Sequence, residues 1–397
     1  MTPLAGRKIW LAGIGGAGMS AYALIAKAWG AEVSGWDKAE TPYLANVRAA
    51  EIPVEIAPEP TLPGSEWERY VSTAFTARVE GRPRAELLAE LVSLRKSIVV
   101  SGAHGKTTTS GMIAFCLDRL GLDPAFIVGG EIAQLGGNAR AGSGWLVVEG
   151  DESDRSVAAL RPEIAVLLNV DLDHHTTYAS LAEVEQLFED WLAQVPQVVR
   201  AEDLEPVDLT LALPGEHNRL NAAAALAALE LAGVERAAAE RVIVEYRGAG
   251  RRFDERGEAG GVRVFDDYAH HPAEVAATLA AARERAGEGR LAVFFQPHLY
   301  SRTRHLAREF ARALAAADAV CIAEIYAARE DPVAGVSGKL VVDALAEVRP
   351  GMPLAWTPAL ADGVRYLAGW VKPGDLVFTV GAGDVDRAGP MLLAALA

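Results

Sequence analysis

Short continuous runs of apolar residues alternate along the chain with stretches of helical periodicity. The apolar runs lie at 8–14, 31–37, 97–102, 145–151, 164–170, 262–268, 291–297, 319–326 and 375–381. Continuous apolar runs are typical of parallel strands covered on both faces by helices, because neither face then meets water. The alternation therefore predicts an α/β protein built from parallel sheets.

The length of 397 residues predicts two or three domains. We place one boundary before the apolar run at 97 and another before the Gly- and Arg-rich stretch that begins at 247. The predicted domains are therefore 1–96, 97–244 and 245–397.

Composition narrows the class of partner. The formal net charge of −15 weighs against nucleic acid, because phosphate backbones require clustered Lys and Arg. No stretch is long and apolar enough to span a bilayer, and the glycine-rich residues 9–28 do not resemble a signal peptide. Cys116 and Cys321 each lie in an apolar run, so we expect buried free thiols and a cytoplasmic location.

A candidate phosphate-binding turn lies at 102–107, "GAHGKT", after an apolar run and before a helical pattern. Glycines let backbone N–H groups approach phosphate oxygens, and the helix N-terminus adds a positive dipole end. Lys106 is expected at the β- and γ-phosphates and Thr107 at Mg²⁺. Position 100 is Val where the common pattern has Gly, so this is a shortened variant. The alternative is a chance Gly-Lys-Thr turn.

Acidic residues follow two later strands, where Mg²⁺ would find oxygen ligands. They are Glu149, Asp151, Glu152, Asp154, Asp171 and Asp173, with His174 and His175 beside the last two. Each alone could be a solvated charge or a helix cap. Whether Glu149 or Glu152 lies closer to the metal stays open.

A second glycine-rich turn, "GIGGAG" at 13–18, follows the first predicted strand, and Asp37 ends the next one. This pattern is the dinucleotide fingerprint, which taken alone would indicate an NAD- or FAD-dependent oxidoreductase. A UDP-sugar also carries a diphosphate, so two such turns favour two phosphorylated ligands.

The last third of the chain concentrates His and Arg at predicted strand-to-helix turns, in 265–275 and 294–310. Arginine suits bidentate recognition of carboxylate and phosphate. Arg252 lies upstream of them in "GAGRRF", where a function is favoured over a solvated role.

Several stretches together resemble the motifs of the Mur ligase family, and within it the alanine-adding branch. They are "GIGGAGMS", "GAHGKTTT", "EGDESD", "NVDLDHHTTY", "PGEHNRLNAAAA", "GAGRRFDERG", "DDYAHHPAEV" and "FQPHLYSRTR". The resemblance implies three domains: a Rossmann-like N-terminal domain that holds UDP, a central P-loop domain that holds ATP, and a C-terminal Rossmann-like domain that closes over both. It implies an ATP- and Mg²⁺-dependent ligase that joins L-alanine to UDP-N-acetylmuramate through an acyl phosphate, acting as a monomer or homodimer in the synthesis of peptidoglycan precursors.

The resemblance also assigns roles to residues of this chain. Those expected to bind ATP are Gly102, His104, Gly105, Lys106, Thr107, Thr108, Asn218, Asn221, Arg252 and Asp267. Those expected to bind the UDP-sugar or alanine are Gly15, Gly16, Ala17, Gly18, Met19, Ser20, Asp37, Ser72, His298 and Arg302. The expected metal ligands are Thr107, Glu149 and His174, and the expected catalytic residues are Lys106, Arg252, His298 and Arg302.

The chain departs from the family pattern in places. The segment between Tyr178 and Pro214 is short, the Gly-His element expected within 49–65 and the Asn-Pro-Glu expected after Ala74 are absent, and Leu299 stands where some members have Arg. A related ligase with another acceptor or amino acid therefore stays an alternative, as does the oxidoreductase.

Overall fold

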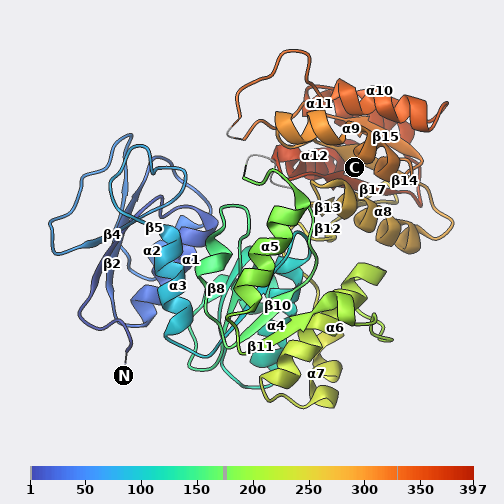
Figure 1. The fold of residues 1–397 in the computed structure, drawn as a ribbon. Helices are drawn as coiled ribbons and strands as arrows, with labels where there is room; N and C mark the ends of the chain where they lie inside the picture. The colour runs from blue at the N-terminus through green and yellow to red at the C-terminus, as the bar shows by residue number, and fades with distance from the viewer. Residues whose placement is uncertain (1, 173–176, 329) are drawn as a thin grey trace. The chain divides into compact units, whose positions relative to one another are not determined.

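The structure is a computed structural model, and it describes residues 2–172, 177–328 and 330–397 (Figure 1). The chain groups into two compact units, Met1–Thr210 with Leu220–Arg247, and Leu211–Arg219 with Gly248–Ala397. The first unit contains two mainly parallel sheets and the second contains one. The α/β class and the three-sheet architecture predicted from the sequence are confirmed. The domain boundaries at 96 and 244 stay predictions.

The first sheet has the strand order β3-β2-β1-β4-β5, and its neighbours pair in parallel. Its strands are β1 Lys8–Ala12, β2 Glu32–Asp37, β3 Val54–Ile56, β4 Glu68–Val71 and β5 Arg82–Pro83, and its helices are α1 Ala17–Ala28, α2 Leu44–Ala49 and α3 Arg84–Ser93. Figure 1 shows the three helices beside this sheet. Ile9 and Leu11 of β1 are fully buried against apolar residues of α1 and α3.

The second sheet has the order β11-β10-β6-β9-β7-β8, with only β7 and β8 antiparallel among its described strands. Its strands are β6 Ser97–Ser101, β7 Ala125–Ile132, β8 Gly137–Arg140, β9 Leu146–Glu149, β10 Ile164–Leu167 and β11 Gln197–Arg200. Its helices are α4 Lys106–Arg119, α5 Leu181–Leu192, α6 Glu216–Leu231 and α7 Arg236–Ile243. Every residue of β6 is buried, which accounts for its continuous apolar run.

The third sheet has the order β12-β13-β17-β14-β15-β16, with β12 and β13 antiparallel. Its strands are β12 Asp254–Ala259, β13 Val262–Asp267, β14 Leu291–Phe295, β15 Ala319–Ile322, β16 Leu354–Trp356 and β17 Leu376–Val380. Its helices are α8 Pro272–Ala286, α9 Tyr300–Leu314, α10 Lys339–Val348, α11 Leu360–Trp370 and α12 Ala388–Leu396. Alternate residues of β14 pack into two cores, one with α8, α9 and α10 and the other with α11 and α12.

The topology places both glycine-rich turns at a reversal of strand order. β1 lies between β2 and β4, and β6 lies between β9 and β10. The order in which the chain adds strands to each sheet therefore changes direction at β1 and at β6. Ligands of open α/β sheets bind at the carboxyl ends of strands at such reversals. Among the described residues, no helix combines the length and apolar character that crossing a membrane requires.

Candidate active site

The phosphate turn joins β6 to α4 through two glycines with positive φ. Gly102 has φ +135°, and a Cβ there would lie 2.9 Å from the carbonyl oxygen of Asn169. Gly105, the N-cap residue of α4, has φ +85°, and a Cβ there would lie 2.6 Å from Oδ1 of Asn221. Both the backbone conformation and the close neighbours therefore require glycine. The same arrangement leaves the first N–H groups of α4 available for an anion.

The Lys106 ammonium folds back over its own turn. Nζ donates to the carbonyl oxygens of Gly102 at 2.6 Å and Ala103 at 3.2 Å, and it lies 3.1 and 3.0 Å from the two carboxylate oxygens of Glu152. Burial lowers the pKa of Lys106, but the charges of Glu152, Glu149 and Asp151 outweigh burial and raise it. Lys106 is therefore held in its protonated, positively charged form.

Of the two glutamates considered as metal ligands, Glu149 contacts Thr107 and Glu152 contacts Lys106. The Thr107 hydroxyl donates to Oε2 of Glu149 at 2.8 Å, and the backbone N–H of Gly129 donates to the same oxygen at 2.7 Å. A hydroxyl and a carboxylate at one point are hard oxygen ligands, so these residues fit Mg²⁺. Glu152 is engaged with Lys106 instead. The third predicted metal ligand, His174, lies outside the described residues, as do Asp173 and His175.

Asn169 clamps the phosphate turn, and the sequence did not single it out. Its Oδ1 accepts the backbone N–H of His104 at 2.8 Å, and its Nδ2 donates to the carbonyl oxygen of His104 at 3.0 Å. The Ala103 N–H donates to the Asn169 carbonyl at 3.2 Å. Nε2 of His104 lies 3.4 Å from Oδ2 of Asp171, so the His104 ring lies near the carboxyl end of β10, as the Asn169 side chain does. The sequence signal that could have identified Asn169 is a side-chain amide at the carboxyl end of a buried strand, β10.

The N-terminal glycine turn is organised by Asp37. Its Oδ2 accepts the N–H of Gly15 at 2.9 Å, and Thr41 donates to the Gly15 carbonyl at 2.7 Å. Ser72 lies against Gly13, where an added Cβ would come within 2.9 Å of its Cβ. The sequence-predicted residues of this turn thus cluster at the ends of β1, β2 and β4, as a diphosphate site requires.

The predicted residues on α1 divide by burial. Gly16 is the exposed N-cap residue of α1, and Ala17 and Gly18 at the start of the helix are partly buried. Met19 belongs to the apolar core, and the Ser20 hydroxyl donates to the carbonyl oxygen of Ala17 at 3.0 Å. Substrate contact by these residues stays a prediction, and burial gives Met19 a packing role.

Arg84 connects the N-terminal glycine-rich turn with the acidic loop after β9, and sequence reasoning missed it. Its Nη2 donates to Asp151 at 3.0 Å and Asp154 at 2.9 Å, after β9, and a Cβ on Gly18 would lie 3.4 Å from its Nη1. Burial raises the pKa of Asp151, but Ser153, Arg84 and Lys106 together hold it below its usual value. Asp151 is thereby held as a carboxylate.

In the second unit, Asp267 ends β13 and is 6% exposed. Its two oxygens accept the N–H groups of Phe253 at 2.8 Å and Ala269 at 2.9 Å and the Thr278 hydroxyl at 3.1 Å. Burial raises the pKa of Asp267 in spite of the nearby Arg252 charge. The predicted ribose ligand therefore also organises the loop that carries Arg252.

Arg252 is held over an aromatic ring. Its guanidinium carbon lies 5.2 Å from the centroid of Tyr268, and Nη1 lies 3.7 Å from Glu274. The preceding Arg251 is structural: it pairs with buried Asp266 at 2.8 Å and donates to the carbonyl oxygens of Gly383 and Gly381. Sequence reasoning did not separate these adjacent arginines.

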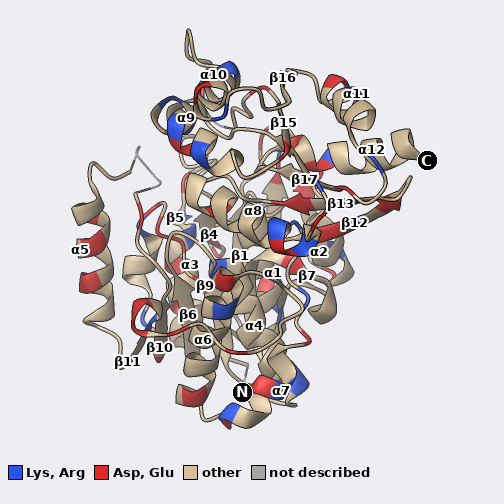
Figure 2. Ribbon diagram, turned by 90° about the vertical axis from the view of Figure 1, so that its right-hand side faces the viewer, with Lys and Arg blue, Asp and Glu red and all other residues tan. Residues whose placement is uncertain are grey.

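His298 and Arg302 form one unit at the start of α9. Nη1 of Arg302 lies 3.1 Å from Nδ1 of His298, and the His298 ring stacks on Tyr326 with centroids 5.9 Å apart. Arg302 is only 2% exposed to solvent, so its buried guanidinium holds the His298 ring in one orientation. Between them Leu299 has φ +71° and ψ +134°, which is strained for a non-glycine residue. Figure 2 shows that α9 is rich in basic residues.

Asn218 and Asn221, the predicted adenine contacts, lie one turn apart on α6. Asn218 donates to the Pro214 carbonyl at 2.8 Å, and Asn221 faces the phosphate turn at Gly105.

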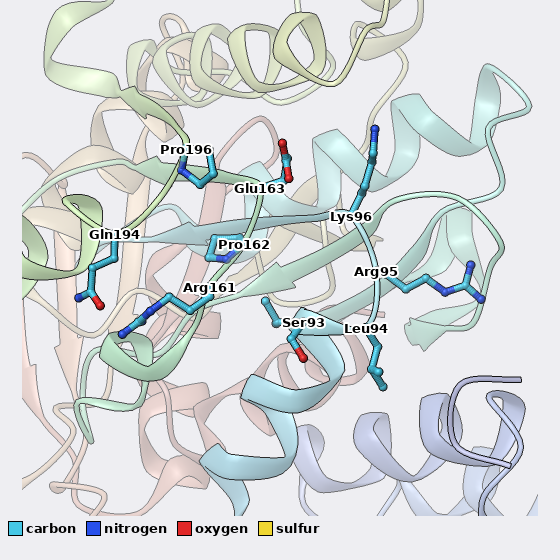
Figure 3. A pocket seen from close by; sticks show the side chains of 10 residues that line it. Ser93, Leu94, Arg95, Lys96, Arg161, Pro162, Glu163, Gln194 and Pro196 are labelled. Carbon is cyan, nitrogen blue, oxygen red and sulfur yellow. The ribbon is translucent and has the colours of Figure 1, made fainter.

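A separate cavity of about 460 Å³ lies at the amino ends of β6, β10 and β11 (Figure 3). Its three basic side chains have partners of their own: Arg95 donates to the carbonyl oxygen of Ser143, Arg161 donates to the carbonyl oxygens of Ala158 and Leu160, and Lys96 lies over the Trp145 ring. It lies at the opposite end of the strands from the phosphate turn.

Two protein-family models match this chain, one in its N-terminal part and one in its C-terminal part. Residues 8–96 match the model of the Mur ligase family catalytic domain, and residues 251–383 match that of the Mur ligase glutamate ligase domain. A UDP-N-acetylmuramate–L-alanine ligase of Rubrobacter xylanophilus is 40% identical over 449 aligned residues, covering 98% of this chain and all of that protein. The alignment exceeds the 397 residues of this chain, so that relative carries residues that this chain lacks.

Solved structures agree. The UDP-N-acetylmuramate–alanine ligase of Thermotoga maritima superposes with a TM-score of 0.79 at 26% identity, covering 98% of each chain. The MurF ligase of the same organism, solved in complex with ADP, shares the fold with a TM-score of 0.59 at 16% identity, covering all of this chain and 96% of that one. The family resemblance of the motifs is confirmed, and the chain belongs to the Mur ligase family.

Proposed function

We propose that this protein joins L-alanine to the carboxylate of UDP-N-acetylmuramate at the expense of ATP, making a peptidoglycan precursor. The observation that carries the proposal is full-length similarity to a ligase of that name, together with an intact Gly102–Thr107 phosphate turn. The relatives reported above are ligases, which removes the support for an oxidoreductase.

In the proposed reaction, the carboxylate of UDP-N-acetylmuramate attacks the γ-phosphorus of ATP, and ADP leaves with the electron pair of the broken P–O bond. The resulting acyl phosphate is then attacked at carbon by the alanine amine, which loses a proton, and inorganic phosphate departs. No nucleophilic side chain is required, so catalysis rests on positioning and on charge stabilisation.

The chain's own residues supply these two contributions. The first N–H groups of α4 and the Lys106 ammonium face the terminal phosphates and stabilise the charge that develops on them. Thr107 and Glu149 would hold Mg²⁺, which neutralises phosphate charge when it is bound.

The second unit supplies cations and an imidazole at the carboxyl ends of its strands. Arg252 offers a guanidinium for phosphate, and its stacking on Tyr268 restricts its orientation. His298, oriented by Arg302, offers a nitrogen for the substrate carboxylate or the alanine amine.

The test is direct. Purified protein is incubated with ATP, Mg²⁺, UDP-N-acetylmuramate and L-alanine, and the joined product is sought by mass spectrometry while ADP is quantified. A matched panel replaces L-alanine by glycine, L-serine or a tripeptide, which addresses the alternative of another acceptor raised by the short 178–214 segment. ADP formation that depends on a different amino acid would replace alanine in the proposal, and absence of nucleotide binding would refute it.

A further inference from the structure

The Lys106 ammonium and the Glu152 carboxylate form a buried ion pair. The Lys106 side chain is 16% exposed and the Glu152 side chain 5% exposed, with Nζ 3.0 Å from Oε2. A carboxylate this buried is costly unless a positive charge faces it. Each partner therefore offsets the cost of burying the charge of the other.

The contacts of Nζ within the site already employ every donor of the ammonium. A lysine ammonium has three N–H bonds. Those of Lys106 point to the carbonyl oxygens of Gly102 and Ala103 and to the carboxylate of Glu152. A phosphate oxygen can bind Nζ only by replacing one of these acceptors.

Glu152 is the acceptor that a phosphate displaces. The two carbonyls belong to the turn that cradles the phosphates, whereas Glu152 carries a full negative charge that repels them. A polyphosphate and Glu152 therefore compete for one cation. The outcome of this competition sets how tightly the nucleotide tail is held.

The backbone of Glu152 is anchored, so Lys106 is the partner that moves. The Glu152 carbonyl accepts the hydroxyl of buried Tyr178, and it also accepts the N–H of Arg155 at 3.0 Å. These bonds fix the residue in the loop after β9. A flexible four-carbon lysine stem can swing, whereas the shorter glutamate side chain starts from a backbone that is held in place.

Glu149 contrasts with Glu152, although both follow the same strand. Its carboxylate contacts the Thr107 hydroxyl and the Gly129 N–H. Two glutamates three positions apart thus hold adjacent residues of the phosphate turn, one the lysine and the other the threonine.

We infer that Glu152 is a latch for Lys106: it holds the ammonium before ATP binds, yields it to the terminal phosphates, and takes it back as ADP leaves. The inference deepens the proposed function, since it requires only that the nucleotide tail bind in the Gly102–Thr107 turn. Breaking the pair consumes part of the binding free energy of ATP, and reforming it assists release of product.

The test is Glu152→Gln, which keeps shape and an acceptor oxygen but removes the competing charge. The dissociation constants of ATP and ADP are measured by calorimetry, with Mg²⁺ and with EDTA. Both nucleotides should bind roughly tenfold more tightly to the variant, since a hydrogen bond to a charged group is lost from the competing state. The KM for ATP should fall without a rise in kcat. Glu163→Gln, the same change at an exposed site at the amino end of β10, should alter none of these values.

A second readout is thermal unfolding. Without nucleotide, Glu152→Gln should melt at a lower temperature than the wild type, because Lys106 loses its charged partner, and saturating ATP should raise its melting temperature more than that of the wild type. Glu152→Asp retains the charge and should fall between the two proteins in nucleotide affinity.

Three outcomes would overturn the latch. Weaker nucleotide binding by Glu152→Gln in both buffers would make Glu152 a simple support for Lys106. Weaker binding only with Mg²⁺ would make it a metal ligand, and unchanged binding would mean that no competition exists. A wild type that binds no ATP would instead refute the proposed function, so the two failures are distinguishable.

Discussion

Replacing Gly105 by Ala tests the geometry of the phosphate turn, and Gly121→Ala is its matched control. Both glycines flank α4 and have positive φ, +85° at Gly105 and +73° at Gly121. A Cβ at Gly105 would lie 2.6 Å from Oδ1 of Asn221, whereas a Cβ at Gly121 meets no atom within 4 Å. The pair therefore shares the cost of left-handed backbone and differs in the steric clash.

The magnitude follows from these two terms. An alanine in the left-handed region costs about 1 kcal/mol, and this applies to both variants. Overpacking at Gly105 adds about 1–3 kcal/mol, because either the Asn221 side chain or the turn backbone has to shift. We expect Gly121→Ala to lose about 1 kcal/mol of unfolding free energy with unchanged ATP affinity. Gly105→Ala should lose about 2–4 kcal/mol and bind ATP much more weakly.

Urea unfolding and calorimetric titration with ATP and Mg²⁺ measure both quantities. Combining Gly105→Ala with Asn221→Ala removes the clashing amide, so the stability deficit relative to Gly121→Ala should shrink. If Gly105→Ala binds ATP as the wild type does, the turn does not cradle phosphate and the reasoning fails.

Three further changes have defined outcomes. Lys106→Ala should abolish ADP formation while leaving circular dichroism unchanged, and full turnover would remove the phosphate turn from the mechanism. Burial, assisted by Arg219, lowers the pKa of His217 to about 4, so its folded form favours the neutral ring. Stability is then complete above the unfolded pKa and falls as the pH drops toward 4, by about 2 kcal/mol between pH 7 and pH 5. Urea midpoints at the two pH values should show this loss, and His217→Gln should reduce it. Arg251→Ala leaves the fully buried Asp266 short of a cation and should cost about 3 kcal/mol in urea unfolding. The control Arg263→Ala, which breaks an exposed pair, should cost under about 1 kcal/mol, and equal costs would contradict the assignment.

The sequence by itself determined the fold class and the buried strands. All nine apolar runs contain strands of the three sheets, because a strand buried on both faces needs apolar residues at every position. Most of the strands that pattern reading missed are short or lie at sheet edges, and the exception is β7, which has eight residues and lies between β9 and β8. β12, with the sequence DERGEA, has four charged residues because it is an edge strand whose side chains are at least partly exposed, and β5 has only two residues. Such strands are held by backbone pairing and leave little mark in the pattern.

The sequence also determined the contiguous part of the candidate site. Gly102, Gly105, Lys106 and Thr107 are adjacent in the chain, and their role follows from a local turn between a strand and a helix. A turn of this kind needs no distant partner to be recognised.

Only the tertiary structure decided which distant side chains complete that turn. Glu149 meets Thr107 across 42 positions, Glu152 meets Lys106 across 46, and the Asn169 side chain clamps His104 across 65. The stretch "EGDESD" contains four acidic residues within six positions. The local sequence does not show which of them contacts Lys106 or Thr107, because β9 and the loop after it set the direction in which each carboxylate points. Parallel sheets bring strand ends together from remote segments, so partner choice is a property of the sheet order, which no single stretch of sequence contains.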